Sequence, residues 1–266
     1  MTTIRSSRVE TVHRQESLVV ALLPAAGRGL RMGGSVPKQF LSIGGEPLIV
    51  QSLRILQAAP VIDQIVLAVP PADIEYCKNE IVARHRFTKV AKVVAGGVER
   101  QDSVRSALAE VPSDTDIVLI HDAVRPFVTQ RMIDEVVAAA KKDGAAIVAL
   151  PMRDTVKHVR MDRVIERTVD RGPLWLAQTP QAFRRDWIET AHRKGHAEGV
   201  QATDDAFLVE WMGYPVSVVE GSGENIKVTR PEEMVIGEAI LAMRMKERRT
   251  SGTRGTSKSR LSRQSR

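Results

Sequence analysis

A glycine-rich stretch with three cations follows the first apolar segment of this sequence. Residues 22–41 read LLPAAGRGLRMGGSVPKQFL, in which Arg28, Arg31 and Lys38 are spaced among four glycines. Glycine lets backbone N–H groups approach and point at an anion, and the cations neutralise its charge. The stretch therefore predicts a loop that binds phosphate, with a purely structural turn as the alternative.

Two widespread phosphate-binding loops do not fit this stretch. The dinucleotide-binding pattern G-x-G-x-x-G requires a third glycine where the chain has Met32, and Gly33 comes one place late. The P-loop requires G-K-[ST], which is absent. With its additional cations, the loop suits a triphosphate better than a dinucleotide.

Asp122 is the carboxylate with the best position for a metal ion. It follows the apolar residues 117–120 and His121, and Arg125 is three residues away. Mg²⁺ takes one or two carboxylates together with substrate phosphates, so Asp122 is a candidate ligand. The alternative is a carboxylate that caps a turn or pairs with Arg125. His121 is interpreted as structural, because no Ser/His/Asp arrangement or zinc-ligand spacing surrounds it.

Other residues later in the chain carry weaker signals. Gly96-Gly97 with Ser103 fits either the pocket of a base or a plain strand-to-helix turn. Arg125 and Arg171 suit a second phosphate, because the guanidinium group is a planar fork of donors, but surface ion pairs are the stronger interpretation from the residues alone. From its local sequence alone, Lys227 is interpreted as a surface lysine.

Buried strands and amphipathic helices alternate along the chain and position these residues. Apolar runs predict strands at 18–23, 64–69, 92–95, 116–120 and 145–150, and helical periodicity predicts helices at 47–58, 73–84, 99–111 and 131–142. This alternation indicates a parallel sheet with helices on both faces. Ligands bind beyond the carboxyl ends of such strands, where the glycine loop, Gly97 and Asp122 all lie.

The alternation stops after residue 151. Residues 155–169 alternate apolar and polar side chains around Met161-Asp162, which predicts a hairpin. From the residues alone, a solvated hairpin and an arm that packs on another subunit are equally supported. A short extended piece is expected at 175–180, helices at 184–194 and 203–212 with Thr203 as N-cap, a strand at 216–219, an extended segment at 226–228 and a closing helix at 231–248.

The net charge of +7 comes from the carboxyl-terminal end. Residues 244–266 hold nine Lys or Arg and one Glu, a net of +8, which leaves −1 for the rest. We therefore expect one domain at 18–246 between a flexible arm at 1–17 and a disordered basic tail at 247–266, and we do not expect nucleic acid as a partner. The single cysteine, Cys77, an amino terminus without an apolar core and the lack of any membrane-spanning run favour the cytoplasm and no membrane partner.

Seven motifs occur together in the order found in one family. These are PAAGRGLRM…PKQF, GGVERQDSV, HDAVRPF, RDTVK, VDRGPLWLAQTPQ, TDDA and ENIKVTRPE, and the resemblance that they carry covers about residues 18–241. In this combination the chain resembles the 2-C-methyl-D-erythritol 4-phosphate cytidylyltransferases. The resemblance implies transfer of CMP from CTP to methylerythritol phosphate with release of pyrophosphate, in the non-mevalonate route to isoprenoids. It also implies a Rossmann-like nucleotidyltransferase fold with a mostly parallel sheet, Mg²⁺ or another divalent cation, and a homodimer joined by a protruding β-arm at about 153–171.

The same resemblance implies roles for individual residues. Arg31 and Lys38 would stabilise the α-phosphate in the transition state, and Lys227 would contact the nucleotide phosphates. Asp122 would bind the metal. The cytidine pocket would be formed by Ala25, Ala26, Gly27, Gly97 and Ser103, and the sugar phosphate would be bound by Arg125, Thr155, Arg171 and Thr179, with Thr155 and Arg171 donated by the partner subunit.

Two positions depart from the family pattern: Asp205 stands where many relatives have Glu, and Glu224 where Asp is common. The nearest alternative is a ribitol 5-phosphate cytidylyltransferase, which shares the PKQF-type loop, although the segment with Arg171 and Trp175 resembles the methylerythritol enzymes more. A non-catalytic nucleotide-binding regulator is a second alternative, which the complete set of cations argues against. A substrate phosphate is already ionised near neutral pH, so no general base is expected.

Overall fold

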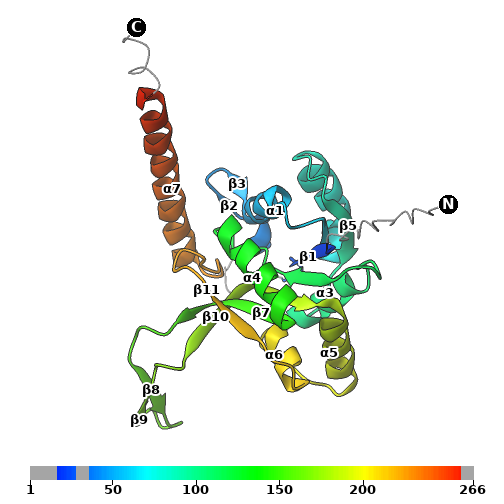
Figure 1. Cartoon of the computed structure of the whole chain (residues 1–266), viewed down its shortest axis with the longest axis vertical. Coiled ribbons are helices and arrows are strands. Elements are labelled where there is room, and N and C mark those ends of the chain that lie inside the picture. The colour runs from blue at the N-terminus through cyan, green and yellow to red at the C-terminus, as the bar shows by residue number, and fades with distance from the viewer. Residues whose placement is uncertain (1–16, 28–35, 259–266) are drawn as a thin grey trace, which may run out of the picture.

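The computed structural model describes residues 17–27 and 36–258. Arg31 and the rest of the segment 28–35 therefore lie outside the described residues. Within them, the largest sheet has seven strands in the order β11-β7-β10-β6-β1-β4-β5 (Figure 1). In that order the strands are Ser217–Glu220, Ala145–Pro151, Trp175–Arg184, Ile117–Ile120, Val19–Pro24, Gln64–Val69 and Val90–Ala95.

The sheet is mostly parallel, as predicted, and β10 is antiparallel to both of its neighbours, β6 and β7. The sequence prediction of a short extended piece at 175–180 was wrong in length, because β10 continues to Arg184 and lies inside the sheet. Its polar residues Gln178, Thr179 and Gln181 break the apolar pattern of a central strand, and yet all three are buried. Pairing with two strands, rather than local propensity, creates this element.

Helices cover both faces of the sheet because side chains alternate along each strand. On β1, Val19, Ala21 and Leu23 pack with one face, whereas Val20 and Leu22 pack with the other. The first face is covered by α1 (Leu48–Ala58), by the helical segment 71–83 and by α4 (Gln130–Asp143). The second is covered by α3 (Arg100–Leu108), α5 (Arg185–Ala197) and α6 (Asp205–Trp211).

The helix predicted at 73–84 is a composite. A 3₁₀ turn at Pro71–Asp73 leads into α2 (Ile74–Tyr76) and then into π-helical turns at Cys77–Ala83. One other prediction was wrong. The N-cap of α6 is Asp204, whose carboxylate accepts from the Phe207 N–H at 3.0 Å, and not Thr203. The segment 226–228, expected to be extended, belongs to no sheet and attaches to the body through the Val228 N–H, which donates to the Val124 carbonyl at 2.8 Å.

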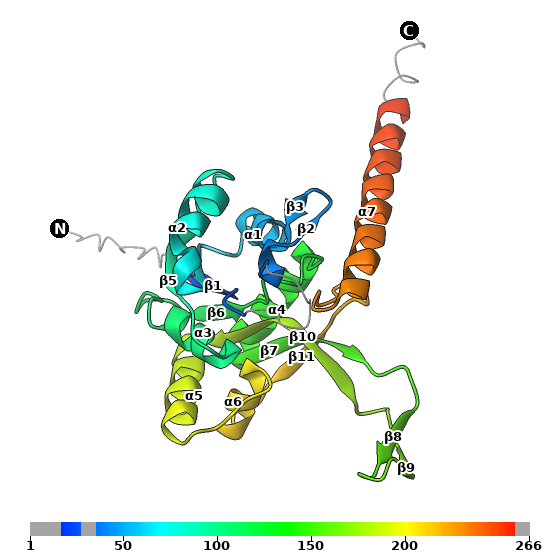
Figure 2. The same ribbon diagram turned by 180° about the vertical axis from the view of Figure 1, so that it is seen from behind.

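The predicted hairpin is present and projects from the body. It consists of β8 (Val156–Val159) and β9 (Ile165–Val169), which pair antiparallel. Figures 1 and 2 both show it standing clear of the sheet, at the end of two extended stems that continue from β7 and into β10. Its tip exposes apolar side chains, and Met161 is fully exposed. We call residues 152–174 the β-arm.

A third apolar cluster joins the closing helix α7 (Pro231–Lys258) to the body. It packs Ile240 against Phe127, Val228 and Ile43, the last from the small hairpin of β2 (Ser42–Ile43) and β3 (Glu46–Pro47). The predicted helix end near 248 was too early, since α7 continues to Lys258 and its distal part extends beyond the body (Figure 2). Among the described residues, no helix is long and apolar enough to cross a membrane.

Candidate active site

A cavity of about 260 Å³ lies beyond the carboxyl ends of β1 and β6. One wall is the loop that follows β1, the second is the start of α3, and the third is the segment after β6. The lining includes most of the predicted residues, namely Ala25, Ala26, Gly27, Lys38, Ser103, Asp122 and Lys227, together with Gln39, Glu99 and Arg100. Residues that are distant in sequence therefore meet at the carboxyl ends of the strands, where ligands bind to parallel sheets.

The remaining predicted residues fall into two groups. Gly97 lies beside the cavity, and its N–H donates to the Ser103 hydroxyl at 3.1 Å. Arg125 and Thr179 lie directly behind Asp122. In contrast, Thr155 and Arg171 belong to the β-arm, where they line a separate hollow with Thr168 and Asp170. The single chain does not bring these two residues to the cavity.

Two cations hold the carboxylate of Asp122. Arg100 Nε lies 2.8 Å from Oδ1 and Lys227 Nζ lies 2.8 Å from Oδ2, while Arg125 Nε is 3.9 Å from Oδ2. Burial alone would raise the pKa of Asp122, but the charges of Arg100 and Lys227 outweigh it and hold the pKa well below its usual range. Asp122 is therefore an ionised carboxylate at neutral pH.

A chain of hydrogen bonds with a fixed direction supports Asp122 from behind. Burial lowers the pKa of His121 to about 4, so its ring is neutral at pH 7. The Arg125 carbonyl can only accept, so the ring proton lies on Nε2, 3.1 Å away. Nδ1 then accepts from the Thr179 hydroxyl at 3.1 Å, and that oxygen accepts from the Asp122 N–H at 3.0 Å. The one proton of Thr179 is thus donated to His121.

The loop with Lys227 is fixed by a buried asparagine. Asn225 is fully buried, and its Nδ2 donates to the Thr179 carbonyl at 2.9 Å and to Gln178 Oε1 at 3.1 Å. Arg125 Nη1 donates to the Asn225 carbonyl at 2.7 Å. These bonds connect β10, the segment after β6 and the late loop, so Lys227 is held at the cavity although no strand carries it.

Close packing explains the two glycines after β5. A Cβ on Gly96 would lie 2.3 Å from the Cβ of Ala26, and one on Gly97 would lie 2.2 Å from the Cβ of Asp102. Both distances are too short for real atoms, so these positions require glycine. Across the cavity, Lys38 lies along Gly27, since a Cβ there would be 3.7 Å from Lys38 Nζ.

Arg100 was not singled out from the sequence. It is the first residue of α3, where the helix dipole disfavours a cation. A cation at the start of a helix indicates an acidic partner elsewhere in the fold, which is the signal that could have identified it. The partners here are Asp122 and Asp205, and they come from distant parts of the chain.

The donor set at the cavity fits a magnesium ion held jointly with substrate. Among the described residues, no group of three or more His, Cys, Asp or Glu side chains could form a complete protein cage. Asp122 offers one ionised carboxylate, and Mg²⁺ commonly binds through one or two carboxylates plus substrate phosphates.

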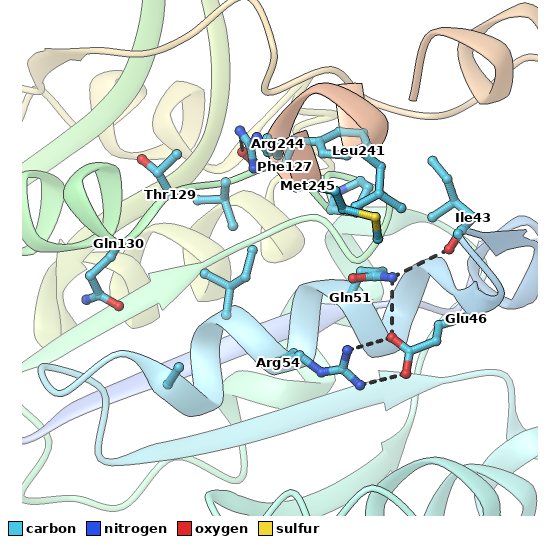
Figure 3. A pocket seen from close by; sticks show the side chains of 15 residues that line it. Ile43, Glu46, Gln51, Arg54, Phe127, Thr129, Gln130, Leu241, Arg244 and Met245 are labelled. Carbon is cyan, nitrogen blue, oxygen red and sulfur yellow. Dashed lines mark hydrogen bonds and ion pairs between the residues drawn. The ribbon is translucent and has the colours of Figure 1, made fainter. Parts of the chain in front are cut away.

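A larger cavity of about 500 Å³ lies between α1, α7 and the segment 126–130 (Figure 3). Its lining is mainly apolar, with Ile43, Phe127 and Leu241. Its charged groups are paired, Arg54 with Glu46 inside the cavity and Arg244 with Glu224 outside it. Arg54 makes two bonds of 2.6 and 2.7 Å to Glu46. This cavity has no cluster of cations directed at a shared point, so it does not suit a triphosphate.

The fold and the cavity together define a nucleotidyltransferase of the α/β class. At the carboxyl ends of a mostly parallel sheet lie Gly27, Lys38, Lys227 and an ionised aspartate, which are suited to phosphoryl chemistry. The chain belongs to the 2-C-methyl-D-erythritol 4-phosphate cytidylyltransferase family, whose model matches residues 19–243.

Individual relatives agree with this assignment. A protein named 2-C-methyl-D-erythritol 4-phosphate cytidylyltransferase from Syntrophus aciditrophicus is 49% identical over 223 residues, which cover 84% of this chain and 95% of the relative. One with the same name from Geobacter metallireducens is 46% identical over 226 residues, covering 84% and 97%. The crystal structure of the Thermus thermophilus protein of that name superposes with a TM-score of 0.69 at 33% identity, covering 84% and 98%. The ribitol phosphate alternative is not favoured.

Proposed function

We propose that the cavity bounded by Lys38, Asp122 and Lys227 is the active site at which this chain transfers the cytidylyl group of CTP to 2-C-methyl-D-erythritol 4-phosphate. Membership of the family gives the reaction, which belongs to isoprenoid biosynthesis. The observation that supports the location is the convergence of Arg100 and Lys227 on an ionised, buried carboxylate, in a cavity that Gly27 and Lys38 also line.

The reaction is an in-line displacement at phosphorus. A phosphate oxygen of methylerythritol phosphate attacks the α-phosphorus of CTP, a new P–O bond forms, and the bond to pyrophosphate breaks. The nucleophile is ionised near neutral pH because the second pKa of a phosphate monoester is about 6. This agrees with the neutral, buried state of His121, which is engaged on both nitrogens and has no base role.

Repulsion between the two negatively charged substrates is the main obstacle to the reaction, and we propose that the cations of the site offset it. Lys38 and Arg31 would stabilise the charge that develops at the α-phosphate, and Lys227 would bind the nucleotide phosphates. Asp122 would hold the magnesium ion, which when bound supplies positive charge to the phosphates. Ala25, Ala26, Gly27, Gly97 and Ser103 would form the cytidine pocket through small side chains and backbone groups.

The sugar phosphate would be bound by residues from two subunits. Arg125 and Thr179 lie beside Asp122, whereas Thr155 and Arg171 lie on the β-arm, outside the cavity of their own chain. The exposed apolar residues of the arm tip favour contact with another molecule. We therefore propose a homodimer in which each arm completes the partner's site. The single cysteine and the absence of a spanning helix among the described residues favour the cytoplasm.

Pyrophosphate release provides the test. The chain is incubated with CTP and methylerythritol phosphate, with Mg²⁺ or with EDTA, and ribitol 5-phosphate replaces the methylerythritol substrate in a parallel reaction. We expect release that requires both methylerythritol phosphate and the metal. Faster turnover of ribitol 5-phosphate would overturn the substrate assignment, and full activity in EDTA would overturn the metal assignment.

A further inference from the structure

The carboxylate of Asp122 is held asymmetrically. Oδ1 contacts Arg100, whose side chain is 27% exposed, and Oδ2 contacts Lys227, whose side chain is 37% exposed. Lys227 is a flexible point charge from a loop, and within the described part of the chain its ammonium group pairs with Asp122 alone. Arg100, by contrast, is fixed on its far side by a second carboxylate.

That second carboxylate belongs to Asp205, which is 1% exposed. Arg100 Nη1 lies 2.7 Å from Asp205 Oδ2, so the planar guanidinium group bridges two aspartates. Burial alone would raise the pKa of Asp205, but Arg100 and the hydrogen bond from His192 outweigh it and leave the pKa lowered. Burial alone would lower the pKa of Arg100, but the two aspartates raise it. All three groups are therefore charged.

His192 forms the last contact in this series. It is 2% exposed, and its Nε2 lies 3.0 Å from Asp205 Oδ1. An ionised carboxylate can only accept, so Nε2 carries a proton. The series His192–Asp205–Arg100–Asp122 thus connects α5, α6 and α3 to the segment after β6.

We propose that Arg100 is a positioning residue, held in place by Asp205 and His192, which fixes Oδ1 of Asp122 so that Oδ2 is the oxygen open to a divalent cation. This inference rests on the proposed role of Asp122. A charged group that must stay in one orientation needs partners on both sides, and Arg100 has them. Lys227 can leave Oδ2 for a substrate phosphate, because it is bound to Asp122 on one side only.

The chemistry of the residues favours arginine at this position over lysine. A lysine carries a compact charge on a flexible stem and cannot span two carboxylates with a rigid fork. Removing the Asp205 charge would leave the buried guanidinium balanced by Asp122 alone, and Asp122 would then bind a divalent cation more weakly. Groups that orient a metal ligand typically change metal affinity by about 10–100-fold when altered.

The experiment measures Mn²⁺ binding in the presence of CTP and without the second substrate, through the electron paramagnetic resonance signal of free Mn²⁺, after the loss of signal caused by the same CTP concentration without protein has been subtracted. The variants are Arg100→Lys, Asp205→Asn and His192→Leu, with His192→Gln as the matched control that retains a donor. We expect the Mn²⁺ dissociation constant to rise by about 10–100-fold in Arg100→Lys and Asp205→Asn, less in His192→Leu, and by less than about 2-fold in His192→Gln.

Thermal unfolding of each variant separates positioning from stability. If all three variants have lower melting temperatures but unchanged Mn²⁺ affinity, the series from His192 to Asp122 has only a structural role, and the inference is overturned. His192→Leu, the variant furthest from Asp122, decides the outcome if Arg100→Lys does not fold. Asp122→Asn is the reference variant. If it is the one variant that weakens Mn²⁺ binding, the inference about Arg100 fails and the proposed metal site stands. If Asp122→Asn leaves Mn²⁺ binding unchanged, the proposed metal site itself is overturned.

Discussion

Lys38 lies along Gly27 at the cavity, and we expect it to act mainly in the transition state. Lys38→Ala should lower kcat by about 10²–10³-fold, because a preorganised charge at a developing oxyanion contributes about 3–4 kcal/mol. Steady-state pyrophosphate release measures this. Lys78→Ala is the control, since Lys78 is an exposed lysine paired with Glu75. A near-normal kcat in Lys38→Ala would remove the residue from the mechanism.

Cys77 has no role in the proposed chemistry and should be inert. It is fully buried in the core, and burial, with the charge of Asp73, raises the pKa of its thiol to about 12. The raised pKa keeps the thiol protonated and unreactive at pH 8. Modification by a disulfide reagent at pH 8 should therefore be at least about 100-fold slower in the native protein than in denaturant, because it requires unfolding. Rapid labelling of the native protein would contradict this.

At the scale of elements, the turn between β5 and α3 sets the width of the proposed nucleotide pocket. Gly96→Ala would place a Cβ 2.3 Å from Ala26 and 2.9 Å from the Ser103 hydroxyl, and Ala26 has no flexible end that could move aside. The loop after β1 must then shift. We expect KM for CTP to rise at least about 10-fold and the protein to lose about 1–3 kcal/mol of stability, the typical cost of overpacking.

Gly223→Ala serves as the control for this prediction. No atom lies within 4 Å of a Cβ at Gly223, so an added methyl group meets open space. We expect kinetic constants and the melting temperature close to those of the parent chain. Equal effects of the two substitutions on KM would show that the close approach of Gly96 to Ala26 does not shape the pocket.

Elements with a strong local pattern were predictable from the sequence. Strands such as β1 and β4 are continuous apolar runs, and α1 and α4 have apolar residues at helical spacing. β10 was predicted only in part and too short, because Gln178, Thr179 and Gln181 are buried only through contacts made in the fold. The position of the cavity was predictable, because ligands bind beyond the carboxyl ends of strands that are themselves predictable. The bridge from Arg100 to Asp205 was not, since the two residues are more than a hundred positions apart and meet only in the fold.

At the scale of the whole molecule, the position of the β-arm predicts a test of subunit exchange. Lys38→Ala disables the site of its own chain, and Arg171→Ala would disable the partner's site if the arm crosses over. A heterodimer of the two variants then contains one intact site. Mixing the inactive variants in equal amounts, with exchange, should restore about a quarter of wild-type activity, because half of the dimers carry one good site of two.

The assay for this exchange uses methylerythritol phosphate well below the raised KM expected for Arg171→Ala. A mixture of Lys38→Ala with Lys38→Ala,Arg171→Ala is the control, and it should stay inactive. No recovery in the first mixture, with exchange verified by tagged subunits, would place Arg171 in the site of its own chain or outside any site.

Strand β10 also links the β-arm to the candidate active site. One end of this strand is the stem of the β-arm, where Trp175 pairs with Pro151, and a few residues further on Thr179 holds the Asp122 N–H. Between these two points the pairing of β10 with β7 is irregular, because the register shifts between Ala177 and Gln181. The arm is nevertheless joined to Thr179 through a single strand. A partner bound to the arm would therefore act on the proposed metal ligand through β10, so that dimer formation and the alignment of the proposed site would be coupled.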